Sequence, residues 1–295
     1  MTALTKRQLL TGIAATATLA ACSKLDTLNG LNRLTPGDGG VRKLVDGASF
    51  GSDVRQRLDV FAPAMHPVAA AASLPVVVFL YGGGWNSGDR GGYAFAARAL
   101  AARGFVVVVP DYRLVPQVVF PTFVEDCAAA LRWTVDRIAT FGGDPARIGV
   151  AGHSAGAYNA MMLALDPRFT TRAGVPKRIR AVVGLSGPYD FLPLDASSAI
   201  AAFGHYPDLD ATQPIHFVRR DAPPALLITG DADTTVRPRN AINLDAALKR
   251  VGASSELRIY PGLGHIGVLL ALSKPFRGKG DVLDVSANFL AQHLG

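Results

Sequence analysis

The segment from Arg147 to Gly156 reads Arg-Ile-Gly-Val-Ala-Gly-His-Ser-Ala-Gly, and it sets the expected fold of the whole chain. A short apolar run leads into Gly-x-Ser-x-Gly, and a helix-forming stretch from Ala157 to Leu165 follows at once. This order predicts that a strand ends, that the chain turns sharply at Ser154, and that a helix begins. Gly152 and Gly156 favour such a turn because neither has a Cβ atom to clash across it.

A serine on such a turn has its hydroxyl exposed above the sheet. The N-terminus of the next helix lies beneath it, so the N–H of Ala155 could bind a negatively charged oxygen. The pentapeptide alone fits equally well a glycine-rich turn that happens to contain a serine. The choice between these interpretations depends on the rest of the chain.

Buried strands alternate with helices, which predicts one α/β domain over residues 41–295, with a mostly parallel central sheet covered by helices on both faces. The stretch 187–224 interrupts the alternation, and we expect it to form a short cap over the active edge of the sheet. The expected buried strands are 76–81, 105–109, 148–151, 181–185, 225–229 and 257–260, preceded by antiparallel strands at 41–50 and 55–61; the expected helices are 93–102, 121–140, 241–251 and 281–293.

Composition excludes several classes of function. With 295 residues and 49% hydrophobic content, the chain can bury a large core. The formal net charge is +7, but no run of Lys or Arg indicates nucleic-acid binding. The two cysteines, Cys22 and Cys127, have no CxxC neighbour, so zinc, iron–sulfur and disulfide frameworks are not expected. We expect neither a metal nor an organic cofactor.

The N-terminus has the pattern of an export signal. Lys6 and Arg7 precede an apolar run that ends at Ala21, which predicts a signal peptide over residues 1–21. Residues 19–22 resemble a bacterial lipobox, so we expect a lipid on Cys22 and a tether over 22–40. The expected location is the periplasmic or external side of a bacterial membrane. A plain secretory signal, which would leave a soluble periplasmic or secreted protein, is the alternative.

The loops that follow the carboxyl ends of the strands should lie together at one edge of the sheet. Gly82, Gly83 and Gly84 come directly after the strand 76–81 and precede Trp85. Consecutive glycines let backbone N–H groups point the same way and let a substrate approach closely. We therefore expect Gly83 and Gly84, with Ala155, to form an oxyanion hole.

Two further strand ends carry titratable side chains. Asp231 and Asp233 follow the strand 225–229, and His265 follows the strand 257–260 on a glycine-rich loop. The order Ser, Asp, His is the order in which α/β hydrolases arrange a catalytic triad. We expect Ser154 as nucleophile and His265 as base, with the two aspartates competing to orient His265.

At this point the chain resembles the α/β-hydrolase superfamily, in the esterase/lipase branch that includes the hormone-sensitive-lipase-like carboxylesterases. It is also similar to the small esterases related to arylformamidases and prenylcysteine methylesterases. The resemblance spans about residues 45–290, and it is carried by Tyr81-Gly82-Gly83-Gly84-Trp85, Asp111-Tyr112-Arg113, Phe141-Gly142-Gly143-Asp144-Pro145, Gly152-His153-Ser154-Ala155-Gly156, and Gly230 through Val236 with His265.

The resemblance implies which aspartate is the acid. In the family it usually stands three residues after the glycine that ends its strand, which selects Asp233 and leaves Asp231 as a turn residue. The glycine loop of the family usually starts with histidine, whereas Tyr81 stands there in this chain. The change leaves open how the loop is braced and which acyl groups fit.

The implied activity is hydrolysis of short- or medium-chain or aryl carboxylic esters through an acyl-enzyme on Ser154. An amidase-type hydrolase such as an arylformamidase would use the same residues. A non-catalytic surface-binding lipoprotein is the alternative of another class, and it would be expected to lack a triad residue. The apolar rim of the pocket is expected from the cap, at Pro188, Tyr189, Phe191, Leu192, Phe203, Tyr206 and Phe217.

Overall fold

The computed structural model describes residues 38–65 and 73–295. The expected signal peptide, Cys22 and most of the expected tether lie outside the described residues, so lipidation of Cys22 stays a prediction. Within the described ranges, no helix has both the length and the apolar character that crossing a membrane requires.

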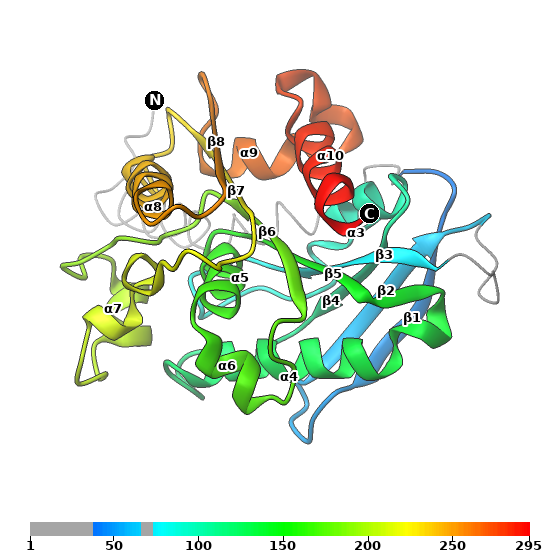
Figure 1. The fold of residues 1–295 in the computed structure, drawn as a ribbon, viewed down its shortest axis with the longest axis horizontal. Coiled ribbons are helices and arrows are strands. Elements are labelled where there is room, and N and C mark those ends of the chain that lie inside the picture. Colours follow the sequence, from blue (N-terminus) through cyan, green and yellow to red (C-terminus); the bar gives the residue numbers. More distant parts are fainter. Residues whose placement is uncertain (1–37, 66–72) are drawn as a thin grey trace, which may run out of the picture.

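The core of the fold is an eight-stranded sheet with the order β1-β2-β4-β3-β5-β6-β7-β8 (Figure 1). β1 pairs antiparallel with β2, and β2 pairs antiparallel with β4, whereas the remaining neighbours are parallel. This is the mostly parallel sheet of an α/β-hydrolase fold, as the sequence predicts. The strands are β1 (Val41–Ser49), β2 (Arg57–Pro63), β3 (Leu74–Leu80), β4 (Val106–Pro110), β5 (Gly143–His153), β6 (Ile179–Leu185), β7 (Ala225–Gly230) and β8 (Ser255–Tyr260).

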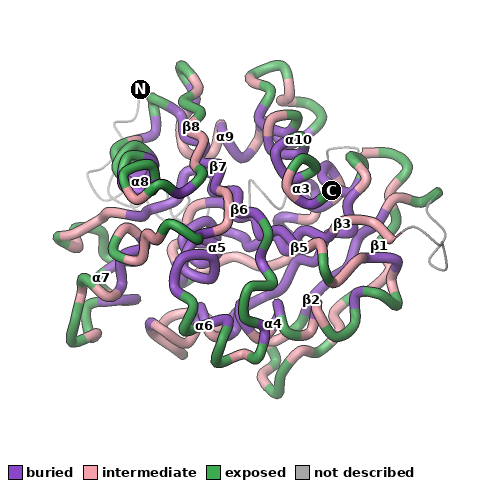
Figure 2. Tube along the Cα trace, in the orientation of Figure 1, coloured by how far each residue is buried: buried purple, intermediate pink, exposed green. Residues whose placement is uncertain are grey.

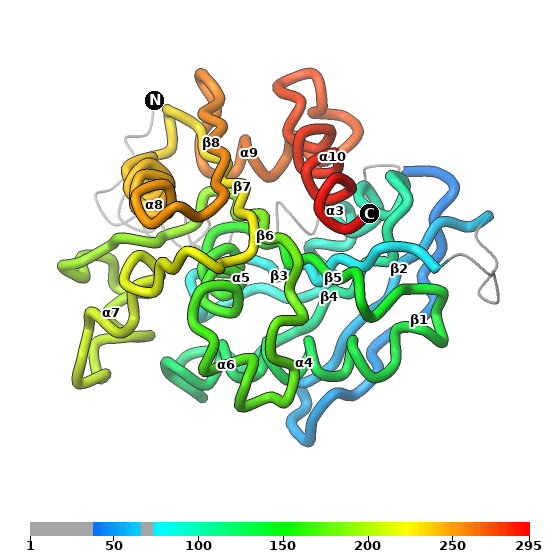
Figure 3. Tube along the Cα trace, in the orientation of Figure 1, coloured from blue at the N-terminus to red at the C-terminus, as the bar shows by residue number. Residues whose placement is uncertain are grey.

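Helices cover both faces of the sheet. One face carries α3 (Ala94–Ala101) and α10 (Val282–Leu294), which also contact each other (Figure 3). The opposite face carries α4 (Thr122–Arg137), α5 (Ala155–Leu165) and α6 (Pro167–Arg172). The β7–β8 end of the sheet is contacted by α8 (Arg239–Arg250) and by α9 (His265–Leu270).

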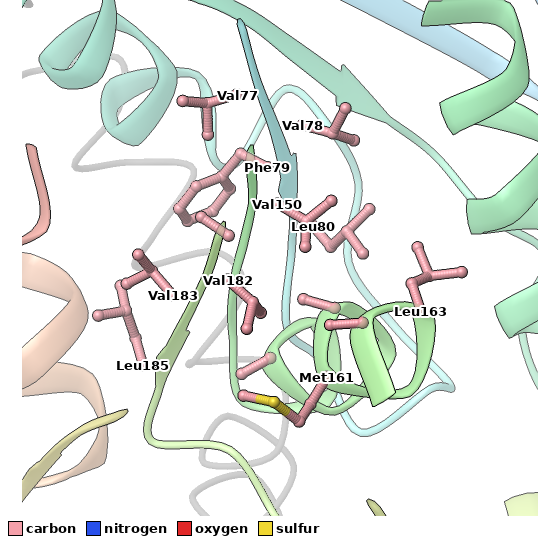
Figure 4. Close-up of a cluster of buried hydrophobic side chains, with 14 of the residues drawn as sticks. Val77, Val78, Phe79, Leu80, Val150, Met161, Leu163, Val182, Val183 and Leu185 are labelled. Atoms are coloured by element: carbon pink, nitrogen blue, oxygen red, sulfur yellow. The ribbon is translucent and has the colours of Figure 1, made fainter. Parts of the chain in front are cut away.

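Because both faces are covered, the central strands contain continuous apolar runs, such as Val76–Leu80 in β3 and Ala181–Leu185 in β6, instead of alternating with polar residues. Every residue of β4 is buried, and so is every residue of α5, which lies between the sheet, α4 and the cap (Figure 2). Neighbouring side chains along a strand point to opposite faces of the sheet, so each central strand packs against both layers of helices. Figure 4 shows this core with Val77, Val78, Phe79, Leu80, Val150, Met161, Leu163, Val182, Val183 and Leu185 labelled.

The expected cap contains no strand, as predicted. It holds α7 (Ser197–Phe203) and two short 3₁₀ turns, η2 (Asp210–Thr212) and η3 (Pro214–Phe217). Two further 3₁₀ turns, η1 (Ile138–Phe141) and η4 (Lys274–Lys279), lie outside it.

The structure differs from the sequence prediction at α6 and α9, which were not expected. His265 is the first residue of α9 and does not lie on a free glycine-rich loop. Only four residues separate the end of β8 from α9, and Gly264 provides the extended position just before the helix. The side chain of His265 is therefore held at a helix start.

Candidate active site

Ser154 lies on a strained turn between β5 and α5. Its φ and ψ angles are 56° and −124°, a backbone conformation that residues other than glycine rarely adopt. The turn is possible because a Cβ atom at Gly152 would collide with the carbonyl oxygen of Gly156, and one at Gly156 with the carbonyl oxygen of Leu80. The N–H of Ser154 donates to the carbonyl of Leu185 at 2.9 Å, which ties the turn to β6. The turn predicted from the sequence is therefore present, with both glycines required.

Left-handed backbone at non-glycine residues is concentrated around this turn. Trp85, Ser154 and Ser186 all have positive φ angles, and they follow the carboxyl ends of β3, β5 and β6. Lys177 is the fourth such residue in the described ranges, and it precedes β6. Strain of this kind persists where the surrounding structure imposes it, and it clusters at functional sites.

Hydrogen bonds join Ser154, His265 and Asp233 in one row. Nε2 of His265 lies 2.9 Å from the hydroxyl oxygen of Ser154, and Nδ1 lies 2.9 Å from Oδ2 of Asp233. A carboxylate can only accept, so Nδ1 carries the proton and Nε2 is free to accept from the serine hydroxyl. The three residues expected at three separate strand ends are thus brought together in the arrangement that activates a serine.

The carboxylate of Asp233 is buried and firmly held. Its Oδ1 accepts hydrogen bonds from the N–H groups of Thr235 and Val236 at 3.0 and 2.8 Å. Burial by itself would raise the pKa of Asp233, but hydrogen bonds from His265 and from the N–H of Val236 outweigh it and hold the pKa below its ordinary value. Asp233 therefore stays ionised beside the imidazole.

Asp231 has a different task. Its Oδ1 accepts from the N–H of Gly262 at 2.7 Å and closes the turn after β8. Of the two competing aspartates, the structure brings Asp233 to His265 and leaves Asp231 as a turn residue.

The glycine loop lies beside the turn at Ser154, because a Cβ atom at Gly82 would come within 2.9 Å of the Cβ atom of Ser154. Gly83, Gly84 and Ala155 line the same pocket as the serine. The carbonyl of Gly83 accepts hydrogen bonds from the N–H groups of Asn86 and Ser87 and from the Ser87 hydroxyl. In a trans peptide the N–H of the next residue points the opposite way from the carbonyl. The N–H of Gly84 is therefore aimed away from this small turn, with its direction fixed.

Arg55 braces the glycine loop in this chain, where Tyr81 stands in place of the histidine of the family pattern. Its guanidinium donates to the Tyr81 hydroxyl at 2.8 Å and to the carbonyls of Gly88 and Tyr112, each at 2.9 Å. Tyr112 stacks on Tyr81 with ring centroids 4.5 Å apart and donates its hydroxyl to the Tyr81 carbonyl. Because Tyr81 and Gly88 flank the loop, Arg55 fixes both of its ends. The sequence carried no signal for Arg55, which lies before β2 and far from the motifs.

His153, the second residue of the pentapeptide, is buried beneath the site with 1% of its surface exposed. Its Nδ1 lies 3.1 Å from the Tyr93 hydroxyl, and its Nε2 lies 3.1 Å from the carbonyl oxygen of His265. Burial, together with the neighbouring His265, lowers the pKa of His153 to about 3, so it is neutral near pH 7. The pentapeptide motif alone does not reveal these bonds.

The pocket above Ser154 has a volume of about 440 Å³. Of the seven apolar residues expected at its rim, Pro188 and Phe191 line it, and Trp85, Val236 and Ile266 provide the rest of its apolar wall. The expected rim is wrong for Tyr189 and Phe203, which are fully buried and pack inward as core. It is also wrong for Leu192, Tyr206 and Phe217, which do not line the pocket. Asn86, Ser87, Asp195, Ser198 and Thr235 add polar positions.

Trp85 links the pocket to the cap. Its ring packs edge-on against Phe203 and Tyr158, with centroids 4.8 and 5.3 Å apart, and stacks against Phe191 at 6.3 Å. The indole N–H donates to Oδ1 of Asn159 at 3.3 Å. The wall nearest the serine is therefore set by aromatic packing.

The described residues hold no cluster of His, Cys, Asp or Glu that could bind a metal ion. His205 and His216 in the cap do not line the pocket. Cys127 is a buried free thiol in α4. The strand order of the sheet and the Ser–His–Asp row on its carboxyl edge define an α/β hydrolase.

Comparison with known proteins places the chain more narrowly. Residues 58–248 match the BD-FAE family, and the chain belongs to that family of α/β hydrolases. Esterase LipC of Mycobacterium tuberculosis is 33% identical over an alignment of 238 residues, and the match covers 73% of this chain and 58% of the relative. The isoprenylcysteine α-carbonyl methylesterase of Arabidopsis thaliana is 30% identical over an alignment of 260 residues, and the match covers 79% of this chain and 58% of the relative. The chain thus spans less than two thirds of the length of these relatives.

Solved structures share the fold. A truncated carbohydrate esterase from gut microbiota superposes with a TM-score of 0.76 and 21% identity over 88% of this chain and 99% of that one. An inhibited esterase B from Lactobacillus rhamnosis superposes with a TM-score of 0.77 and 22% identity over 97% of each chain.

Proposed function

We propose that the protein hydrolyses carboxylic esters through a covalent acyl-enzyme on Ser154. The single observation that carries the proposal is the hydrogen-bonded row from Ser154 through His265 to Asp233, which lies beneath an open pocket. The names of the relatives, an esterase and methylesterases, support an ester as the substrate.

The first half of the reaction acylates the serine. Nε2 of His265 takes the hydroxyl proton as Ser154 attacks the ester carbonyl, and Asp233 stabilises the imidazolium that forms. The carbonyl oxygen becomes an oxyanion bound by N–H groups of Gly83, Gly84 and Ala155. One such donor typically contributes about 3–4 kcal/mol to the transition state. His265 then protonates the leaving alcohol.

The second half restores the enzyme. A water molecule takes the place of the alcohol, His265 removes its proton, and the resulting hydroxide attacks the acyl group on Ser154. The tetrahedral oxyanion occupies the same three N–H groups. Its collapse releases the carboxylic acid and returns the proton from His265 to the serine oxygen.

The pocket supports a short- or medium-chain or aryl ester as the substrate. A volume of about 440 Å³ has room for a compact molecule, and its wall combines the rings of Trp85 and Phe191 with Val236 and Ile266. Phe203, at the end of α7, closes the space behind Trp85.

Side-by-side kinetics on p-nitrophenyl acetate, p-nitrophenyl butyrate and N-formylkynurenine test the proposed substrate class. We expect the highest kcat/KM on one of the two esters and a loss of that activity in Ser154→Ala. A higher kcat/KM on the formamide would identify an amidase-type hydrolase such as an arylformamidase, which would use the same three residues.

We also propose that the protein is exported and held at a bacterial membrane by a lipid on Cys22. Support comes from the sequence alone, from the basic start, the apolar run and the four residues 19–22. Mass spectrometry of the N-terminal peptide from membrane fractions tests this. We expect a lipidated Cys22 as the first residue, and an intact Met1 or an unmodified Cys22 would contradict the proposal.

A further inference from the structure

His153 touches each of the three loops on which the proposed reaction depends. It belongs to the β5 turn, directly before Ser154. Its Nε2 contacts the backbone of His265 at 3.1 Å, and its Nδ1 contacts Tyr93 at 3.1 Å. The Tyr93 hydroxyl also lies against Gly82, at the start of the glycine loop, where a Cβ atom added to Gly82 would come within 2.9 Å of it. One buried side chain thus connects the nucleophile, the base and the oxyanion loop.

The direction of every bond in this chain is fixed by chemistry. The carbonyl oxygen of His265 can only accept, so Nε2 of His153 must carry the proton. Nδ1 is then unprotonated and accepts the hydroxyl proton of Tyr93. The Tyr93 oxygen, which donates its proton to His153, also packs against Gly82. This relay of hydrogen bonds, from the Tyr93 hydroxyl through His153 to the carbonyl of His265, therefore runs in one direction. It requires a neutral His153.

A neutral His153 also suits its neighbour. The rings of His153 and His265 have their centroids 4.7 Å apart. His265 becomes an imidazolium in the proposed reaction, and a second positive charge at this distance would oppose it. The titratable groups facing His153 are Tyr93, His265 and, at longer range, Asp233.

We propose that His153 is a positioning residue that holds the backbone of His265 and, through Tyr93, the glycine loop in register with Ser154. It does not touch the reacting atoms. Its effect acts through placement, where a displacement of about 1 Å can cost about 100-fold in rate. The inference rests on the proposed hydrolase function of the same site.

Two substitutions at His153 separate the roles. His153→Leu leaves a bulky side chain at this position but removes both ring nitrogens. In His153→Gln, the amide N–H₂ group can still donate to the His265 carbonyl. We expect His153→Leu to lower kcat on p-nitrophenyl butyrate about 100-fold, with KM changed less than about twofold. His153→Gln should recover kcat to within about fivefold of the wild type.

Thr134→Val is the matched control, because Thr134 is also fully buried and donates one hydrogen bond, to the carbonyl of Ala130 within α4. It should lower the melting temperature and leave kcat unchanged. If His153→Leu does not fold, Tyr93→Phe removes a single oxygen from the relay, and we expect a loss in kcat of about tenfold at constant KM.

These measurements distinguish a failure of the proposed function from a failure of the positioning role of His153. An inactive wild-type enzyme would overturn the proposed function itself. An active wild type with kcat unchanged in a folded His153→Leu, or in Tyr93→Phe, would overturn only the positioning role. Equal losses in His153→Leu and His153→Gln would likewise contradict it, since the retained donor would then have no effect.

Discussion

The floor of the site and its cap are held together by different forces. The floor consists of the glycine loop, the turn at Ser154 and the start of α9, and charged or buried polar groups such as Arg55, His153 and Asp233 fix it. The cap, residues 187–224, is held mainly by aromatic contacts of Phe191 and Phe203 with Trp85. A few hydrogen bonds at its two ends add to these contacts, from the N–H of Tyr189 to Asn240 and from Arg219 to carbonyls at the end of α5.

This difference separates chemistry from specificity. Hydrogen bonds are directional, so removing a polar group from the floor displaces the reacting groups. Aromatic contacts tolerate changes in size, so a substitution in the cap reshapes the pocket and leaves the reacting groups in place. Substitutions in the floor should therefore lower kcat, whereas those in the cap should change which substrates are preferred.

The largest expected effect is at Asp233. Asp233→Asn replaces an acceptor with an amide that can select the wrong tautomer of His265, and we expect kcat to fall about 10⁴-fold. Steady-state kinetics on p-nitrophenyl butyrate measures it. Asp231→Asn is the matched control, because Asp231 only closes a turn, and its kcat should stay within a few-fold of wild type. A greater loss in Asp231→Asn would reverse the assignment.

The second effect concerns the stability of the floor in acid. Burial lowers the pKa of His153 in the folded protein to about 3, whereas in the unfolded chain its pKa is near the ordinary value of 6.5. The free energy of unfolding therefore decreases as the pH falls from about 6.5 to 3. Between pH 7 and 4.5 the contribution is about 2–3 kcal/mol.

Urea unfolding of the wild type and of His153→Gln at these two pH values measures that contribution. The variant should lose about 2–3 kcal/mol less on acidification. Asp233, whose pKa is lowered, also costs stability in acid, but it does so in both proteins and cancels in the difference. His205→Gln, at an exposed cap residue, should behave as the wild type does. Identical pH dependence in the wild type and His153→Gln would contradict the buried neutral state.

The third effect is at the brace of the glycine loop. Arg55→Met keeps the apolar stem and removes the bonds to Tyr81, Tyr112 and Gly88. We expect kcat to fall about tenfold and the melting temperature to drop, because charge-assisted bonds contribute about 1.5–3 kcal/mol each. Arg57→Met, at an exposed arginine of β2, is the control and should change neither. Unchanged kcat in Arg55→Met would show that the loop needs no brace from this side.

The smallest expected effect lies in the cap. Phe191→Ala enlarges the apolar wall, so the ratio of kcat/KM for p-nitrophenyl hexanoate to that for the acetate should rise about five- to tenfold. The kcat on acetate should stay nearly constant. Ile200→Ala, at a half-exposed residue on α7, should leave the ratio unchanged. A collapse of kcat on every ester would mean that the cap also positions the reacting groups.

The sequence was most informative where one residue type is required at one place. The mostly parallel sheet was predicted from the alternation of buried strands and helices. The turn at Ser154 and the approach of Asp233 to His265 were predicted from motifs that follow buried strands. The choice of Asp233 over Asp231 came from the family pattern, and the hydrogen bonds agree with it.

Partners brought together only by the fold could not be predicted. Arg55 lies 26 residues from Tyr81, and Tyr93 lies 60 from His153. Neither Arg55 nor Tyr93 is part of a motif, because the contact depends on sheet order and on the path of the glycine loop. The prediction of the pocket rim was partly wrong for a related reason. An aromatic residue in a cap can face either the pocket or the core, and Phe203 faces the core.

The central claim is that Ser154 is an activated nucleophile, and labelling with a fluorophosphonate probe tests it most directly. The folded wild type should be labelled on the peptide that contains Ser154, and Ser154→Ala should lose both the label and hydrolysis of p-nitrophenyl butyrate. A folded wild type that takes no label on Ser154, as expected of a non-catalytic binding lipoprotein, would contradict the account. So would undiminished hydrolysis by Ser154→Ala.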